Sequence, residues 1–130
     1  MADDKAEELF KQLKEIDMVN AKGELLSHLE RNKSIIKCAT INCSLSDWYR
    51  EELTEDRRSI DLKEGYTQEE YEEFLHRLDF EYDNGYGGQQ LHGTVWLMKE
   101  GTWLERGEYD GSEWWVYKVC PQIPDNLKAN

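Results

Sequence analysis

Residues 91–119 read LHGTVWLMKEGTWLERGEYDGSEWWVYKV and carry the strongest structural signal in the chain. Three runs rich in β-branched and aromatic residues, at 91–98, 102–109 and 113–119, are typical of strands. Lys99-Glu100-Gly101 fits a three-residue hairpin loop with glycine at the left-handed position. Asp110-Gly111 marks a second turn. These residues therefore predict a three-stranded antiparallel meander.

Side chains alternate between the two faces of a strand, so the hairpin register sorts this stretch into two surfaces. If Met98 pairs with Thr102, then Trp96 lies opposite Leu104. One face then carries His92, Thr94, Trp96, Met98, Leu104, Arg106, Glu108, Trp115 and Tyr117. The other carries Leu91, Val95, Leu97, Trp103, Glu105, Tyr109, Trp114 and Val116. This second face is the more aliphatic, and we expect it to pack against helices.

Trp114 and Trp115 are adjacent, so they point to opposite sides of their strand. We expect one in the core and the other on a partly polar surface. Two interpretations remain for Trp96, Trp115 and Tyr117. They form either a second packing layer, for instance under the N-terminal helices, or an exposed binding face. The second interpretation rests on the enrichment of Trp, Tyr and Arg at interface hot spots.

Upstream of the meander, local patterns predict helices and further strands. Apolar residues recur at helical spacing in 5–16 and in 21–31, where Asn20 is a candidate N-cap. Residues 34–43 and 58–63 have strand character. The helix at 68–78 has the clearest signal, because Thr67 and Glu70 form a capping-box pattern. Pro121 and Pro124 end regular structure.

These elements predict a single α+β domain over residues 1–120. Its helical N-terminal part covers 4–31, followed by the strand at 34–43, the helix at 68–78 and the meander at 91–119. An antiparallel sheet of four to five strands would pack against two to three helices. Residues 121–130 would form a C-terminal tail.

The composition limits the class of protein. A length of 130 residues fits one domain, and 12% aromatic residues argue against disorder. No apolar run approaches the roughly 18 residues that a membrane span needs. The N-terminus lacks the apolar region of a secretory signal. We therefore expect a cytoplasmic protein, in which Cys38, Cys43 and Cys120 stay reduced.

Neither a cofactor nor catalysis has strong support in the sequence. The cysteines lack C-x-x-C spacing. Asp79-x-Glu81-x-Asp83 resembles the start of a calcium loop, but Asn84 and Gln90 replace the glycine and glutamate that the EF-hand pattern requires. His92, Arg106 and Glu108 could form an acid–base cluster, although cross-strand charge pairing is the simpler explanation. We expect a non-enzymatic protein without a cofactor.

Acidic residues are concentrated between positions 51 and 83, where thirteen carboxylates stand against four basic residues, out of a chain net charge of −12. This charge disfavours direct phosphate binding and favours a partner with a basic surface. One interpretation is a hydrated helix face. The other is a surface that imitates the phosphates of a nucleic acid and blocks a basic nucleic-acid-processing enzyme. Small acidic inhibitors of viruses and phages work in this way as a class.

The patterns together predict an acidic intracellular binding or inhibitor protein with a protein partner, and no direct contact with nucleic acid or membrane. The predicted partner-binding residues are Glu69, Glu72, Glu73, Asp79, Glu81, Asp83, Trp96, Arg106, Glu108, Trp115 and Tyr117. The alternative is a domain that binds a small ligand or carbohydrate through Trp96, Trp115 and Tyr117 on the aromatic sheet face.

Overall fold

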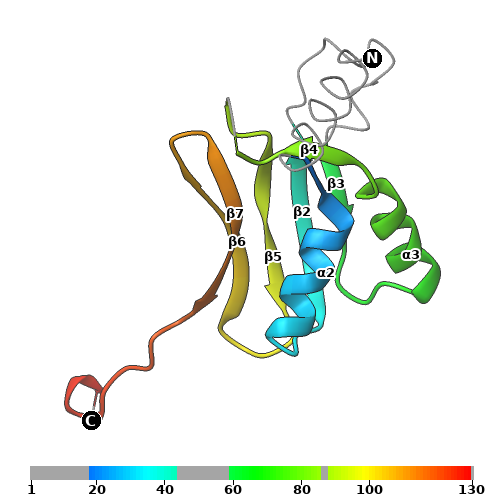
Figure 1. The fold of residues 1–130 in the computed structure, drawn as a ribbon. Coiled ribbons are helices and arrows are strands. Elements are labelled where there is room, and N and C mark those ends of the chain that lie inside the picture. Colours follow the sequence, from blue (N-terminus) through cyan, green and yellow to red (C-terminus); the bar gives the residue numbers. More distant parts are fainter. Residues whose placement is uncertain (1–17, 44–58, 86–87, 130) are drawn as a thin grey trace, which may run out of the picture.

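The computed structural model describes residues 18–43, 59–85 and 88–129, and it shows an α+β fold (Figure 1). The helix predicted at 5–16 lies outside these residues. The elements in chain order are β1 (Met18–Asn20), α2 (Ala21–Arg31), β2 (Ile36–Cys43), β3 (Ser59–Leu62), α3 (Gln68–Arg77), β4 (Glu81–Asp83), β5 (Leu91–Leu97), β6 (Thr102–Tyr109), β7 (Ser112–Val119) and the 3-10 turn η2 (Asp125–Leu127).

Five strands form one antiparallel sheet in the order β3-β2-β5-β6-β7, which confirms the predicted sheet and its C-terminal meander. β1 and β4 form a separate two-stranded sheet that the sequence did not predict. Each of these two strands has three residues, which is too short for an alternating pattern to be recognised.

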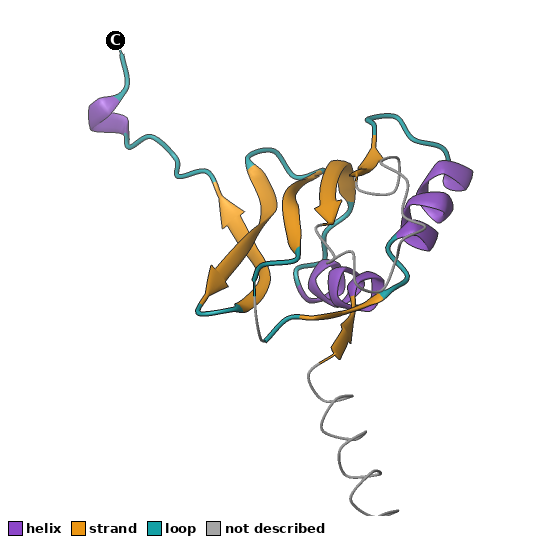
Figure 2. Ribbon diagram, turned by 90° about the horizontal axis from the view of Figure 1, so that it is seen from above, coloured by secondary structure: helices purple, strands orange, loops and turns teal. Residues whose placement is uncertain are grey.

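The helices bury one face of the sheet. α2 lies across that face, and α3 lies beside β3 at the sheet edge (Figures 1 and 2). Leu25 of α2 joins Val95 and Leu104 in the core, while Phe74 and Leu78 bring α3 and its C-cap into the same cluster. This arrangement leaves the opposite face of the sheet without a covering helix among the described residues.

Both predicted helix caps are present. The Asn20 side chain accepts a hydrogen bond from the Gly23 N–H at 2.9 Å at the start of α2. Thr67 and Glu70 form the complete capping box at the start of α3, with both reciprocal hydrogen bonds at 3.1 Å. The strong local signals therefore set the N-terminal ends of these helices where the sequence predicted them.

The predicted register of the first hairpin is wrong by one residue. Trp96 pairs with Trp103 and Val95 with Leu104. The loop therefore spans four residues, 98–101, in place of three, although Gly101 does adopt the left-handed conformation, with φ of 74°. A one-residue shift exchanges the faces of one strand relative to the other. Trp96 lies on the outer face, as predicted, and the shift puts Trp103 opposite it in place of Leu104.

In the second hairpin, the side chains that were predicted to share a face do so, because Arg106 lies opposite Trp115 and Leu104 lies opposite Tyr117. As predicted, Trp114 and Trp115 lie on opposite sides of β7. The assignment of the faces is reversed, however. Trp115 is buried, with 3% of its surface exposed, whereas Trp114 is 40% exposed. The helices therefore cover the face of Leu104 and Trp115, and the prediction that Trp114 faces them is wrong.

Candidate functional site

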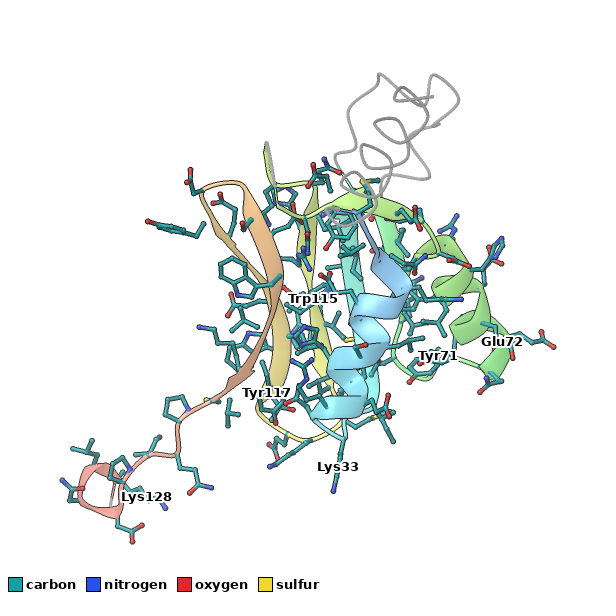
Figure 3. All side chains as sticks on the ribbon, viewed as in Figure 1. Lys33, Tyr71, Glu72, Trp115, Tyr117 and Lys128 are labelled. Carbon is teal, nitrogen blue, oxygen red and sulfur yellow. The ribbon has the colours of Figure 1, made fainter. Side chains whose placement is uncertain are left out.

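The predicted acidic residues of α3 lie together on one exposed surface. Glu69, Glu72 and Glu73 are all exposed, while Phe74 on the same helix is buried. Figure 3 shows Glu72 pointing outward from the helix. Their carboxylates make only weak contacts with neighbours on the helix. Glu72 accepts from Gln68 at 3.4 Å, and Glu73 lies 3.9 Å from Arg77.

Asp79 and Asp83 have structural contacts. Asp79 accepts from Asn20 at 2.9 Å and pairs with Lys22 at 3.4 Å, which ties the start of α2 to the segment after α3. The hydrogen bonds from Asn20 and Lys22 lower the pKa of Asp79. The Asp83 carboxylate accepts from the Gly85 N–H at 2.9 Å, whereas Glu81 is exposed. Asp79 and Asp83 therefore stabilise the local chain conformation.

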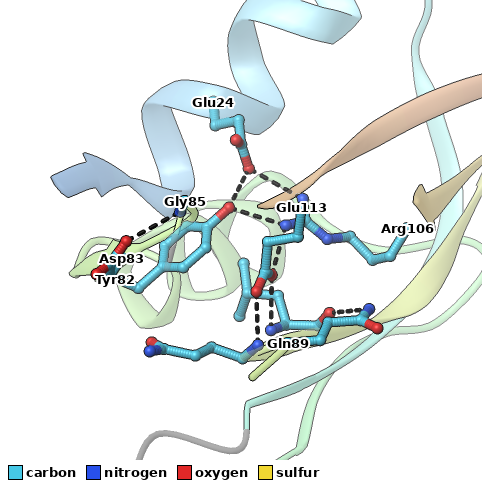
Figure 4. A network of polar contacts seen from close by, with 9 residues as sticks. Glu24, Tyr82, Asp83, Gly85, Gln89, Arg106 and Glu113 are labelled. Atoms are coloured by element: carbon cyan, nitrogen blue, oxygen red, sulfur yellow. Dashed lines mark hydrogen bonds and ion pairs between the residues drawn. The ribbon is translucent and has the colours of Figure 1, made fainter. Parts of the chain in front are cut away.

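Arg106 lies at the centre of a buried polar network that joins four elements (Figure 4). Its guanidinium donates to Glu24 at 3.0 Å, to the Tyr82 hydroxyl at 2.9 Å and to Glu113 at 2.6 Å. Tyr82 in turn donates to Glu24 at 2.6 Å. Only 2% of the Arg106 side chain is exposed, so these contacts replace the water that the charge has lost.

The network raises the pKa values of Arg106 and Tyr82. Burial alone would favour the neutral form of Arg106, but Tyr82, Glu24 and Glu113 outweigh it and raise its pKa. Burial and the hydrogen bond to Glu24 hold the pKa of Tyr82 far above its ordinary value. The guanidinium also lies 4.8 Å from the ring centroid of Trp115 in a cation–π contact. This cluster is a structural tie between α2, β4, β6 and β7.

These contacts place Arg106 and Trp115 inside the protein, away from any surface that a partner can reach. Tyr117 is partly buried and packs against the core. Glu108 is exposed and accepts from the Gly111 N–H at 3.1 Å in the second turn. Of the predicted aromatic residues, Trp96 is the one on the outer face.

The outer face carries tryptophans that sequence reasoning assigned to the core. Trp103 lies directly opposite Trp96 on the neighbouring strand. Trp114 lies over Gly107, because a Cβ atom at Gly107 would stand 2.9 Å from its Nε1. Alternation alone signals that one tryptophan of the adjacent pair Trp114 and Trp115 points outward. Choosing the correct one needs the register, which the loop residues left open.

A recess of about 360 Å³ opens beside this tryptophan pair. It is lined in part by Trp96, Trp103, Met98, Lys37 and Glu100. The lining contains one basic and one acidic residue, Lys37 and Glu100. Lys37 lies 3.1 Å from Glu64, and Lys118 lies 3.8 Å from Glu105. The recess is therefore an aromatic surface with little net charge.

The hypothetical catalytic cluster is not assembled. The register that pairs Trp96 with Trp103 puts His92 on the outer face, while Arg106 is buried on the helix side. In the described ranges, no three His, Cys, Asp or Glu side chains converge in a way that would hold a metal ion. The described helices also include none that is long and apolar enough to cross a bilayer.

Comparisons with models of protein families, with curated proteins and with solved structures found no match to this chain. The case for a function therefore rests on the two surfaces described above, the acidic face of α3 and the aromatic outer face.

Proposed function

We propose that this chain is an acidic binding protein, which inhibits a partner by occupying a basic, nucleic-acid-binding surface. The observation that carries the proposal is the exposed carboxylate array of α3, Glu69, Glu72 and Glu73, on a helix anchored by Phe74. A buried anchor fixes the direction in which the array faces. A partner would therefore meet an ordered set of charges, so little conformational entropy is lost on binding.

The density of charge on α3 is comparable with that of a DNA strand. An α-helix rises about 1.5 Å per residue, so the three carboxylates from Glu69 to Glu73 lie within about 6 Å along the axis. One DNA strand carries a phosphate about every 3.4 Å along the duplex axis. Between residues 59 and 85 the chain carries nine Asp and Glu residues but only two Lys and Arg residues. This region therefore repels nucleic acid and attracts a basic protein.

Replacing Glu69, Glu72 and Glu73 together by lysine should weaken partner binding at least about tenfold without unfolding the domain. The immobilised protein would be exposed to lysate at low and high salt. Retained proteins would be identified by mass spectrometry, and the affinity of a purified one would then be measured. Binding by charge should fall steeply with ionic strength, and added DNA or RNA should compete.

A matched variant controls for net charge. Glu100, Glu105 and Asp125 lie away from α3 and are at least partly exposed, so lysines there change the chain charge equally. This control should retain the partner. Equal binding by both variants, or binding that neither salt nor nucleic acid disturbs, would rule out the mimicry proposal.

The tryptophan recess favours a second candidate function, the binding of an uncharged ligand such as a carbohydrate. Trp96 and Trp103 form an aromatic platform, and sugar C–H groups stack on the negative face of such rings. Glu100 and Lys37 at its rim could orient hydroxyl groups by hydrogen bonds.

If the recess binds carbohydrate, Trp96→Ala should weaken oligosaccharide binding at least about tenfold, because a stacking surface is lost. Trp114→Ala outside the recess should leave it unchanged. Quenching of tryptophan fluorescence by a panel of neutral oligosaccharides would give both affinities. An absence of quenching across the panel would dismiss this function, and dependence on salt would argue against an uncharged ligand.

A further inference from the structure

The chain after β7 forms an arm, residues 120–129, that runs away from the folded body (Figures 1 and 2). The first residue of the arm is hydrogen-bonded to the folded body, because the Cys120 N–H donates to the Gly101 carbonyl at 2.7 Å. Further along, the Leu127 N–H donates to the Pro124 carbonyl at 2.9 Å, and Lys128 pairs with Asp125 at 3.1 Å. Proline fixes φ, so the arm has restricted conformations of its own.

The arm presents two large aliphatic side chains to solvent. Ile123 is 62% exposed and Leu127 is 69% exposed, and every other residue from 121 to 129 is exposed as well. Burying both side chains on a partner would remove a considerable apolar area from water. Short peptide segments commonly dock through a few apolar side chains that enter a groove.

A complementary groove lies on the other side of the same protein, between the end of α2 and the start of α3. It has a volume of about 520 Å³, and its walls include Leu26, Ile35, Tyr66 and Tyr71. The rings of Tyr66 and Tyr71 stack with centroids 5.6 Å apart. Ile35 at this groove is 65% exposed. The groove is therefore an apolar surface with room for aliphatic side chains.

We propose that the arm of one copy docks into the groove of a second copy, with Ile123 and Leu127 as its anchors. The contact is between molecules, because the arm and the groove lie on opposite sides of one chain, as Lys128 and Tyr71 show in Figure 3. Neither surface carries a net charge that would oppose the contact. Asp125 and Lys128 of the arm pair with each other, and both Glu30 and Lys33 line the groove.

Reciprocal docking of two arms closes a twofold-symmetric dimer, in which both contacts are the same. Two weak arm contacts then act together, since the second forms within the complex. This self-association is separate from the proposed binding of a basic partner. It uses neither Glu69, Glu72 and Glu73 nor the tryptophan recess.

Analytical ultracentrifugation of the full chain, up to about 1 mM, tests the proposal. We expect a concentration-dependent dimer. The variant Ile123→Asp/Leu127→Asp should weaken dimerisation by about a hundredfold, since two apolar anchors are lost. Its exposed positions leave the fold intact, as circular dichroism would check. A wild-type protein that stays monomeric overturns the proposal, and so does a dimer that survives in the arm variant.

A mixing experiment distinguishes arm exchange from any other dimer. The groove variant Ile35→Asp should also be monomeric, because a carboxylate replaces an exposed apolar group of the groove. An equimolar mixture with the arm variant should associate more strongly than either variant alone, although less strongly than the wild type, since one intact arm meets one intact groove and the second contact is lost. A mixture that associates no more than either variant alone, while the wild type dimerises, would overturn the assignment of the groove.

Discussion

Replacing Glu113 with alanine should lower the free energy of unfolding by about 3–5 kcal/mol, as expected when one partner of a buried ion pair is removed. The Glu113 side chain has no exposed surface, and its carboxylate accepts from Arg106 at 2.6 Å. It also accepts from the backbone N–H groups of Gln90 at 2.6 Å and Leu91 at 2.9 Å. The alanine variant removes all three contacts together.

The loss is large because the cation stays buried. Arg106 Nε already has no acceptor among the described residues, so the guanidinium would keep only Glu24 and Tyr82. Taking both charges away should cost less than taking one. The double variant Arg106→Met/Glu113→Leu should therefore regain part of the stability lost in Glu113→Ala.

Urea unfolding, followed by tryptophan fluorescence, would measure these differences. Glu105→Ala is the matched control, because that carboxylate is 43% exposed and pairs with Lys118 at 3.8 Å. Its effect should stay within about 0.5 kcal/mol. If Glu113→Ala cost less than about 1 kcal/mol, the network would not be the tie between helices and meander that its geometry indicates.

Gly93→Ala should destabilise the protein by at least about 3 kcal/mol, because strain and a steric collision add up. Gly93 has a φ of 142° and pairs with Ile41 in the centre of the sheet. A Cβ atom there would stand 2.2 Å from the Thr40 carbonyl oxygen and 2.8 Å from the Ile41 Cα. Both obstacles are backbone atoms, so β2 and β5 would have to separate.

Gly65→Ala separates the two causes. Gly65 also has a positive φ, 77°, but nothing lies within 4 Å of a Cβ atom at that position. Its substitution should cost about 1 kcal/mol, from backbone strain alone. Thermal unfolding of the two variants side by side gives the comparison. Similar losses in both would show that β2 and β5 can adjust to the added methyl group.

Gly93 and Glu113 both support the framework that carries the candidate surfaces. Gly93 allows the close pairing of β2 and β5, and β5 carries Trp96 of the recess. Glu113 and Arg106 hold α2 and β4 against the meander, which keeps the buried face closed. The rigidity of the framework is what lets exposed residues act as a preorganised binding surface.

The elements with strong local signals were predictable from the sequence alone. Thr67 and Glu70 define the start of α3 through hydrogen bonds within one turn, and Asn20 does the same for α2. Gly101 and Gly111 mark the two hairpin turns, and both have a positive φ. The exposure of Glu69, Glu72 and Glu73 also followed, because helical spacing places them away from Phe74.

The tertiary structure alone decided which tryptophans face solvent. Trp96 pairs with Trp103, one residue away from the predicted partner Leu104. Because strand side chains have a period of two, this shift of one residue exchanged the predicted faces of the side chains on β6 and β7. Arg106 was misplaced for the same reason. Its partners Glu24 and Tyr82 are distant in sequence, and no local pattern brings them together. Local hydrogen bonds encode caps and turns, whereas register and buried charge pairs depend on how the whole core closes.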